Sequence, residues 1–352
     1  MDFRLNHVDE QFYKTTIKDF LPEDIIDVHT HVWLDDFRCK KKEEPARTVS
    51  WPSMVAKDNS IEDHITSYQI MFPGKKVMPL IFSNLSPGDD LEKGNEYISR
   101  CAKEHQFPSL MYVQPNMPVD ELERKVITGG FVGIKVYLDF APKYIPQNEI
   151  RIYDFLTREH LEVADRNGWI VMLHIPRNDR LKDPVNIAQM MEIDERYKNT
   201  KVIIAHVGRA YCNEDVGDAF LHLRKTQRIY FDISANCNDW VFKELLKNID
   251  HKRILFGSDL PILRMRTKRI CENGKYINLI PKGMYGDVSR DSHMRECTGE
   301  IADQMTLFMY EEIAAFLEAA QEVGLKESSI QDVFYNNARS MLMNAGFDLG
   351  LK

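Results

Sequence analysis

Residues 25–31 read IIDVHTH, a short apolar run that stops abruptly at two histidines. Such a run is typical of a buried strand of a parallel sheet. His29 and His31 are two positions apart, so on an extended strand their side chains point to the same side. Two imidazoles on one side can bind one divalent cation. The segment therefore predicts a strand that ends in a metal site.

Seven further apolar runs rich in Val, Ile and aromatic residues recur along the chain, with helical patterns between them. The predicted strands are 25–28, 77–82, 110–113, 134–138, 170–173, 202–205, 229–233 and 254–256. The predicted helices are 61–71, 91–105, 119–127, 153–166, 185–196, 216–225 and 241–248. This alternation is typical of parallel βαβ units. We predict an α/β fold, a (β/α)8 TIM barrel, with an open doubly wound sheet as the alternative.

The chain continues for about a hundred residues after the eighth predicted strand. Residues 264–301 are polar and show no sustained period, which predicts a long loop or lid. Helical patterns resume over 305–323 and 328–344, and the last is an extra C-terminal helix. A chain of 352 residues, 43% hydrophobic, suits one α/β barrel. We expect a single domain over 1–352, with the barrel core at about 24–323 and a closing helix at about 328–345.

The formal net charge of −8 offers no long-range attraction to nucleic acid or to an anionic membrane surface. A small-molecule substrate is expected instead. The first ten residues, MDFRLNHVDE, lack the basic start and apolar run of a signal peptide, and no stretch reaches membrane-spanning length. These features predict a cytoplasmic protein. Barrels of this size often form homodimers, although no sequence feature requires one.

The six cysteines are far apart and form no C-x-x-C pair, which argues against a thiolate zinc site and a redox motif. They are Cys39, Cys101, Cys212, Cys237, Cys271 and Cys297. In an intracellular chain we expect them to be reduced and mostly structural. Cys271 and Cys297 share one polar segment, but a disulfide between them is not expected.

Ionisable residues stand at the carboxyl ends of further predicted strands. They occur in GIKVYL (133–138), VMLHIP (171–176), VIIAHVG (202–208) and ILFGSDLP (254–261). In a barrel these ends converge on one face, where active sites are built. His174, His206 and Asp259 add neutral nitrogen and anionic oxygen ligands, a set that suits zinc, iron or manganese. Any single histidine is as readily a hydrogen-bonded core residue, but the ordered set favours a metal site.

In this order the motifs resemble the amidohydrolase superfamily, particularly its amidohydrolase-related (amidohydrolase 2) branch, which includes the aminocarboxymuconate-semialdehyde decarboxylase type. The resemblance runs from about residue 24 to 259, and VFYNNARSML (333–342) is similar to the terminal helix of many members. It implies a metal held by His29, His31, His174 and Asp259. His206 is then either a second-metal ligand or a catalytic residue, and we favour the catalytic role.

The resemblance leaves the number of metal ions open. Binuclear members use a carboxylated lysine at the end of strand four, and Lys135 lies in the corresponding run. Similar lysines also occur in mononuclear relatives, where they are not ligands. We expect one divalent ion, with zinc favoured, and two ions if Lys135 is carboxylated. An ammonium facing the substrate is the favoured state of Lys135.

Such a cation would lower the pKa of a bound water toward about 7. Asp259 would accept the proton of that water, and His206 would stabilise an oxyanion or protonate the product. We therefore expect a metal-dependent hydrolase of an amide, lactone or ester. Within the same superfamily the alternative is a mononuclear decarboxylase or hydratase. A binding module without turnover is disfavoured because all five ligand positions are intact.

Basic residues follow several of the predicted strands. Lys135, Arg177 and Arg209 lie at or just beyond the ends of strands four, five and six, which suggests a carboxylate-bearing substrate in this acidic protein. The basic run 264–269 belongs either to this ring or to an ordinary solvated loop. Tyr137 and Trp33 are either pocket residues or core aromatics.

The remaining histidines divide into two groups. His293 lies in the segment after strand eight and is a candidate lid residue. The others, expected at the surface, are His7, His64, His105, His160, His222 and His251. Asp27, two residues before the first histidine of the H-x-H motif, is expected to support the ligands from behind.

Overall fold

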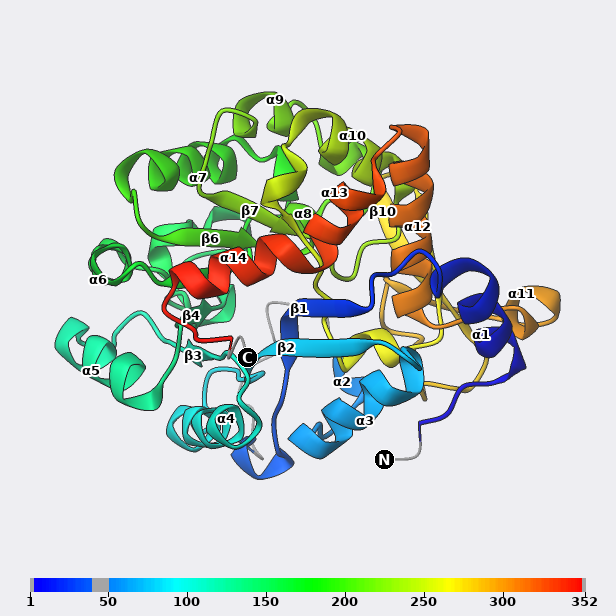
Figure 1. Ribbon diagram of the computed structural model, residues 1–352, viewed down its shortest axis with the longest axis horizontal. Coiled ribbons are helices and arrows are strands. Elements are labelled where there is room, and N and C mark those ends of the chain that lie inside the picture. The colour runs from blue at the N-terminus through cyan, green and yellow to red at the C-terminus, as the bar shows by residue number, and fades with distance from the viewer. Residues whose placement is uncertain (1–2, 40–50, 350–352) are drawn as a thin grey trace.

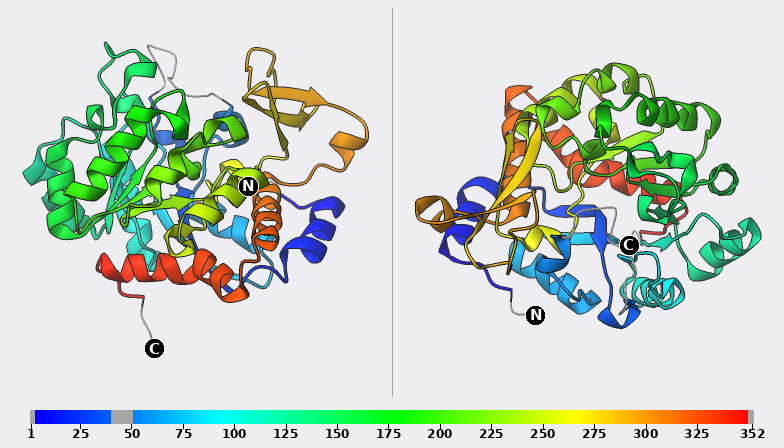
Figure 2. Two further views of the ribbon diagram at one scale, coloured as in Figure 1. Left: turned by 90° about the horizontal axis from the view of Figure 1, so that it is seen from above. Right: turned by 180° about the vertical axis from the view of Figure 1, so that it is seen from behind.

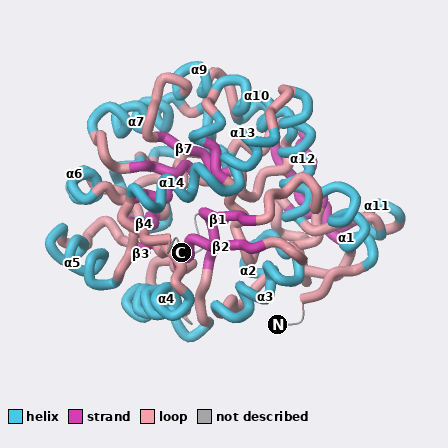
Figure 3. Tube along the Cα trace, viewed as in Figure 1, coloured by secondary structure: helices cyan, strands magenta, loops and turns pink. Residues whose placement is uncertain are grey.

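The computed structural model describes residues 3–39 and 51–349. Eight parallel strands follow one another in chain order, and helices cover them from outside (Figures 1 and 3). The strands are β1 (Asp24–His31), β2 (Lys76–Phe82), β3 (Leu110–Tyr112), β4 (Gly133–Val136), β5 (Ile170–Leu173), β6 (Lys201–Ile204), β7 (Ile229–Asp232) and β8 (Ile254–Leu255). The predicted α/β class with parallel strands is confirmed.

The helices between the strands also lie where the sequence predicts them. They are α3 (Ile61–Met71), α4 (Leu91–His105), α5 (Val119–Gly129), α6 (Arg158–Asn167), α7 (Pro184–Arg196), α9 (Ala219–Leu223) and α10 (Asp239–Asn248). Side-chain caps fix several starts: Ser60 accepts from Asp63 N, and Asp183, which precedes Pro184, accepts from the backbone N–H groups of Val185 and Asn186. Short helices α1 (His7–Phe12) and α2 (Pro52–Val55) lie near the amino terminus. Among the described residues, none of the helices has the length and apolar character needed to cross a membrane.

Regular ladders pair β1 with β2 and join β3 to β8 in sequence. Between these two sheets the links are separate backbone hydrogen bonds, among them Asp259 N to His29 O at 2.7 Å and His31 N to Leu260 O at 2.8 Å. Val28 N donates to Phe256 O at 3.0 Å, and Ile81 N donates to Pro108 O at 3.0 Å. Strands β3 to β8 are apolar and almost wholly buried, as expected where helices cover one face and side-chain layers fill the other.

Residues 268–297 contain three strands, so the prediction of an irregular loop is wrong for this segment. β10 (Lys275–Pro281) pairs antiparallel with β9 (Lys268–Glu272) and parallel with β11 (Met294–Cys297). We call β9, β10 and β11 the cap sheet. Its hairpin turns at Asn273 and Gly274, which have φ of 52° and 72°. An Asn-Gly pair with two positive φ angles is the preferred two-residue hairpin turn, and this signal in the sequence could have predicted the hairpin.

The C-terminal helices are α11 (Glu300–Asp303), α12 (Phe308–Glu322), α13 (Glu327–Gln331) and α14 (Asn337–Asn344), and a π-helical turn (Asp332–Asn336) joins the last two. Helices α13 and α14 cover the opposite side of the strands from the cap sheet (Figure 2, left), whereas α11 contacts β10. Ala338, Met341 and Leu342 pack with Ile26 and Leu255 in one apolar cluster. Burial of this cluster closes the amino-terminal end of the strands.

Gly133 provides a test of how closely β4 and β5 approach. A Cβ atom on Gly133 would lie 1.9 Å from the carbonyl oxygen of Ile170. We expect Gly133→Ala to force the two strands apart and to destabilise the protein by about 1–3 kcal/mol or more. Lys282→Ala is the control, because its side chain is exposed. Equal melting temperatures of the two variants would contradict the packing argument.

Candidate metal centre

Five ionisable side chains from distant parts of the chain meet at the carboxyl ends of the strands. They are His29 and His31 on β1, His174 after β5, His206 after β6 and Asp259 after β8. The ring centroid of His29 lies 5.2 Å from that of His31, 5.4 Å from that of His174 and 4.8 Å from that of His206. The four imidazoles are buried. The structure therefore brings together all five residues that the sequence singles out.

The orientation of the two β1 histidines is fixed by their Nδ1 atoms. His29 Nδ1 lies 2.9 Å from Oδ2 of Asp232, and His31 Nδ1 lies 3.2 Å from the carbonyl oxygen of Ser83. A carboxylate or a carbonyl oxygen only accepts, so each Nδ1 carries the proton and donates it. Burial lowers the pKa of both imidazoles, which stay neutral near pH 7. Each Nε2 is left with its lone pair.

These lone pairs face Asp259. Its Oδ1 lies 3.1 Å from His31 Nε2 and 3.5 Å from His29 Nε2. His29 Nε2 is buried without a hydrogen-bond partner among residues 3–39 and 51–349. Three acceptor atoms that share no proton repel one another, and a divalent cation between them would remove this repulsion. The donor set thus fits zinc, iron or manganese.

Two groups of ligand atoms surround His29. One group consists of His29, His31 and Asp259, and the other of His29, His174 and His206. Within each group the ligand atoms lie within 4.8 Å of one another. The expected ligand set of His29, His31, His174 and Asp259 takes members from both groups. His206, which is not in this expected set, lies directly beside its member His174.

His206 stands at the start of an unusual turn. In α8 (His206–Arg209) all four residues have positive φ, with values of 57°, 49°, 64° and 59°. Consecutive left-handed residues are rare because the Cβ atom crowds the backbone, so the surroundings must hold this turn. The backbone N–H of His206 donates to Asp232 Oδ1 at 2.8 Å. The turn aims the imidazole at His174.

The proton of His206 is on Nδ1. This atom lies 3.1 Å from the carbonyl oxygen of Ser234, which can only accept, and 2.8 Å from Ser234 Oγ. Burial lowers the pKa of His206 to about 4, so the ring is neutral near pH 7. Its Nε2 therefore presents a lone pair, 2.9 Å from Nε2 of His174.

Lys135 lies behind His174. Its Nζ is 2.8 Å from His174 Nδ1, and burial lowers the pKa of the amine to about 7 despite the nearby Asp232 and Asp259. His174 can offer an Nε2 lone pair to a cation only if its Nδ1 carries the proton and donates to a neutral amine. The lowered pKa makes the neutral amine accessible near pH 7. Lys135 thereby controls which nitrogen of His174 is free.

Aromatic rings enclose this side of the centre. The ring of Tyr137 stands edge-on to that of His174 at 4.8 Å, and Phe82 stands edge-on to His31 at 4.8 Å. Lys135 Nζ lies 5.0 Å from the Phe82 centroid and 5.9 Å from that of Tyr137. Tyr137 is thus placed beside the ligands. Trp33 is a buried core residue.

The two arginines expected to bind substrate make other contacts. Arg177 Nε donates to Asp183 Oδ2 at 2.9 Å, at the start of α7. Arg209 Nη1 donates to the carbonyl oxygens of Ile175 and Pro176 at 3.2 and 3.3 Å. These contacts hold the segments after β5 and β6. A sequence places an arginine near a site but does not indicate which acceptor its flexible side chain reaches.

Asp232 and Ser234 are site residues that the sequence analysis missed. Asp232 is fully buried, orients His29 through Nδ1 and accepts from the backbone of His206. A carboxylate that holds a metal-binding imidazole fixes its tautomer and direction. The sequence does contain a signal for Asp232, because this charged residue interrupts an apolar strand at its carboxyl end, as Asp259 does after β8. The predicted strand 229–233 includes Asp232, so it was not considered as a site residue.

Two other expectations about histidines are wrong. His64 is buried between Asn59 and Tyr68, and His160 is buried with Nε2 2.8 Å from the carbonyl oxygen of Met117. Both rings lie on helix faces that pack inward, which a count of apolar residues does not reveal. His7, His105, His222 and His251 are exposed or partly exposed. His293 stacks on Tyr276 in the cap sheet, with ring centroids 4.1 Å apart.

Asp27 supports the centre from behind, as expected. Its Oδ1 accepts from the backbone N–H groups of His29 and Ser258 at 3.1 and 2.9 Å. Its Oδ2 accepts from the Tyr68 hydroxyl at 2.7 Å. Burial raises the pKa of Asp27 to about 7 against these hydrogen bonds. The side chain ties the end of β1 to the segment after β8.

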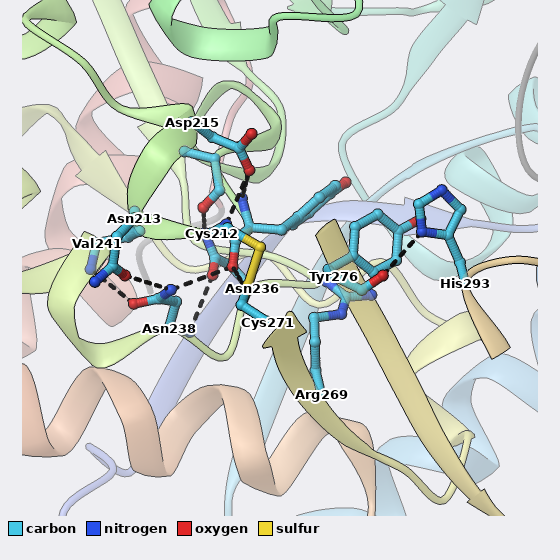
Figure 4. The surroundings of a disulfide bond; sticks show 12 residues. Cys212, Asn213, Asp215, Asn236, Asn238, Val241, Arg269, Cys271, Tyr276 and His293 are labelled. Carbon is cyan, nitrogen blue, oxygen red and sulfur yellow. Dashed lines mark hydrogen bonds between the residues drawn. A yellow bond between two sulfur atoms is a disulfide. The ribbon is translucent and has the colours of Figure 1, made fainter. Parts of the chain in front are cut away.

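Cys212 and Cys271 form a disulfide, so the expectation that all cysteines are reduced is wrong (Figure 4). The bond joins the segment after α8 to β9, across a sequence separation of 59. Their distance in sequence gave no reason to pair them. They meet because the hairpin of the cap sheet folds back over the segment after β6. Cys297 is a free thiol.

The arrangement predicts that the protein retains a divalent cation. Protein purified without chelator is expected to contain about one equivalent, measured by elemental analysis, because the acceptors repel one another without it. His29→Ala and Asp259→Ala are expected to lose it, whereas the control His293→Gln retains it. A content below about a tenth of an equivalent in the unaltered protein would refute the assignment.

Asp232→Asn tests how His29 is oriented. Asparagine can present either its carbonyl oxygen or its amide to Nδ1, so the preferred tautomer of His29 is lost. We expect the affinity for Zn²⁺ to fall about 10–100-fold in a chelator competition. The control is Asp287→Asn on the exposed surface. An unchanged affinity in Asp232→Asn would show that His29 does not depend on this carboxylate.

Comparisons with known proteins place this arrangement in a family. The amidohydrolase family model matches residues 26–277. An amidohydrolase 2 from Bifidobacterium longum subsp. infantis superposes with a TM-score of 0.52 at 16% identity, covering 93% of this chain and all (100%) of the other. A dihydroxybenzoic acid decarboxylase from Polaromonas sp. JS666, with bound manganese, superposes with a TM-score of 0.54 at 14% identity. The match covers 92% of this chain and 97% of the other.

A proposed 2-pyrone-4,6-dicarboxylic acid hydrolase from Pseudomonas putida gives a TM-score of 0.52 at 14% identity, covering 94% of this chain and 100% of the other. No curated protein sequence matches the chain significantly. At these identities the solved structures show the fold alone, whereas the family model spans well over half of the chain. The chain therefore belongs to the amidohydrolase family, and it is a metal-dependent enzyme of that superfamily.

Proposed function

We propose that the protein hydrolyses a small, carboxylate-bearing amide, lactone or ester, with His206 as the catalytic base. In this proposal one divalent cation, zinc being favoured, is held by His29, His31, His174 and Asp259. The observation that carries the proposal is the state of His206: a buried neutral ring whose Nδ1–H is held by Ser234 and whose Nε2 lone pair faces the ligands.

The chain's own groups suit the proton transfers of hydrolysis. The bound cation supplies a Lewis acid that polarises the scissile carbonyl and lowers the pKa of water. His206 Nε2 accepts one proton from the attacking water and returns it to the leaving oxygen or nitrogen, so that acid and alcohol or amine are formed. Asp259, which the sequence suggested as the acceptor of this proton, is proposed instead to orient the water through its carboxylate. Ser234 stabilises the transient imidazolium because it accepts from Nδ1–H.

Substrate recognition is proposed for Lys135 and Tyr137. Lys135 is buried beside His174, and as a neutral amine it can accept from His174 Nδ1–H while its own N–H groups donate to a substrate carboxylate. Tyr137 provides an aromatic wall beside His174. The contacts of Arg177 and Arg209 favour a role in holding the loops rather than the substrate.

We also propose that the eight strands form a closed (β/α)8 barrel. Backbone hydrogen bonds support closure at both junctions: Val28 to Phe256, Asp259 to His29 and His31 to Leu260 at one, and Ile81 to Pro108 at the other. The isolated bridges Thr30–Leu260 and Ile81–Ser109 lie at the same two junctions. Closure would explain why strand ends from both sheets converge on one centre.

Decarboxylation is the second candidate, and Lys135 is the observation that favours it. An amine with a pKa of about 7 can donate a proton near neutrality. In that protonated state it donates to His174 Nδ1, so this candidate leaves the cation to His29, His31 and Asp259. Loss of carbon dioxide from a carboxylate leaves a carbanion, and protonation by Lys135 would complete the reaction. Fold neighbours with decarboxylase names are consistent with this candidate.

The two candidates can be separated with the metal-loaded full chain. Small carboxylates with a lactone, ester or amide group and hydroxybenzoic acids are incubated in H₂¹⁸O, and products and carbon dioxide are measured by mass spectrometry. Hydrolysis is expected to place ¹⁸O in the product carboxylate. His206→Asn is expected to lower kcat about 10²–10⁴-fold while the metal content stays unchanged.

The control is His293→Gln, which removes an imidazole in the cap sheet. Release of carbon dioxide without hydrolysis would overturn the hydrolase proposal in favour of decarboxylation. Unchanged kcat in His206→Asn would remove the catalytic role of His206 in either reaction.

A further inference from the structure

The bend after β7 connects His206 with two elements outside the parallel strands. Ser234 holds the Nδ1 side of His206 through both its carbonyl oxygen and its hydroxyl. The next residue, Ala235, has a φ of 50°, in the left-handed region that an alanine rarely adopts. Such a bend persists only where its neighbours hold it.

Both polar backbone groups of Ala235 are held by side chains. Its N–H donates to Oε2 of Glu312 on α12 at 2.6 Å. Its carbonyl oxygen accepts from Nη1 of Arg269 on β9. Ala235 is therefore clamped between a helix on one side and the cap sheet on the other. The mechanism proposed above uses neither Glu312 nor Arg269.

Glu312 is unusual among the acidic residues. It is fully buried, and its Oε1 has no hydrogen-bond partner in the described part of the chain. Burial raises the pKa of Glu312 well above the usual range, although the hydrogen bond from Ala235 opposes this rise. The carboxyl is thus held neutral, and Ala235 needs only its carbonyl-type oxygen. A glutamine has the same shape and the same acceptor.

Arg269 is fixed from several directions. Its guanidinium lies 4.7, 4.5 and 4.5 Å from the ring centroids of Tyr211, Tyr276 and Phe308. Its Nε donates to Asn278 Oδ1 on β10 at 2.9 Å. Two residues further along β9, the Cys212–Cys271 disulfide ties the strand to the segment after α8 (Figure 4). The cap sheet thus presents a rigid donor to Ala235.

We propose that Glu312 and Arg269 are positioning residues for His206. They fix Ala235, and through it Ser234, so that the proton of His206 stays on Nδ1 and the Nε2 lone pair keeps its direction toward His174. The disulfide secures the strand that carries Arg269. This inference rests on the proposed role of His206, but the experiment below needs no turnover.

The experiment observes His206 directly in the full chain loaded with Zn²⁺. Histidines are labelled with ¹⁵N, and the signals of His206 are identified by their loss in His206→Asn. We expect one proton-bearing Nδ1 and one proton-free Nε2 in the unaltered protein. Glu312→Gln is expected to preserve both signals because its amide oxygen accepts from Ala235.

Variants that remove the clamp are expected to shift the signals toward a mixture of tautomers. These are Glu312→Leu and Arg269→Met, with Arg269→Lys expected to be intermediate. Opening of the disulfide in Cys271→Ser is expected to shift the signals in the same direction as Arg269→Met. Zinc content and melting temperature are measured for each variant, so that only folded, loaded protein is compared.

Two matched controls are available. Glu318→Leu changes an exposed position of α12, and Arg295→Met changes an exposed arginine of β11 that pairs with Glu272. Both are expected to leave the His206 signals unchanged. Unaltered signals in folded Arg269→Met would overturn the proposal, even if Glu312→Leu does not fold. Absence of turnover with every substrate would count against the proposed hydrolysis. The ¹⁵N signals of His206 would still decide whether Glu312 and Arg269 position its ring.

Discussion

Mutual repulsion among buried acceptors is the constraint on which the centre depends. The Nε2 atoms of His29 and His31 both face a carboxylate oxygen of Asp259, and no proton lies between them. Because these atoms are largely buried, this arrangement is costly unless a cation binds. The fold keeps these acceptors together because Asp232 and the Ser83 carbonyl oxygen accept hydrogen bonds from the Nδ1–H groups of His29 and His31. Cation binding is thus prepared by hydrogen bonds one layer behind the ligands.

Other side chains around the centre also hold site residues through hydrogen bonds. Asp27 ties β1 to the segment after β8, and Ser234 holds His206 as Asp232 holds His29. Left-handed backbone at His206, Ala235 and Asp259 gathers around the centre. Such conformations persist only where surrounding contacts determine them. Asp232 holds the backbone of His206, His29 holds that of Asp259, and Glu312 of α12 and Arg269 of the cap sheet hold that of Ala235.

Much of the fold and part of the site could be predicted from the sequence. The apolar runs stop at His29, His174 and His206, and parallel strands place their carboxyl ends together, so local pattern and topology suffice. Arg177, Cys212 and Cys271 could not be placed in this way. The reach of a long side chain and the pairing of distant cysteines depend on how loops fold over the strands. His64 was misplaced because it lies on an inward-facing side of its helix.

The sequence by itself determined the order of strands and helices, the residues at the strand ends and the resemblance that these residues carry. These features are local, since side-chain periodicity and the stops of apolar runs are set by a few neighbouring residues. Only the tertiary structure decided which nitrogen of His29, His31 and His206 carries the proton, and that Asp232 and Ser234 hold two of these rings. Those properties depend on acceptors that come from strands and loops far apart in the chain, and only the folded chain brings them within hydrogen-bonding distance.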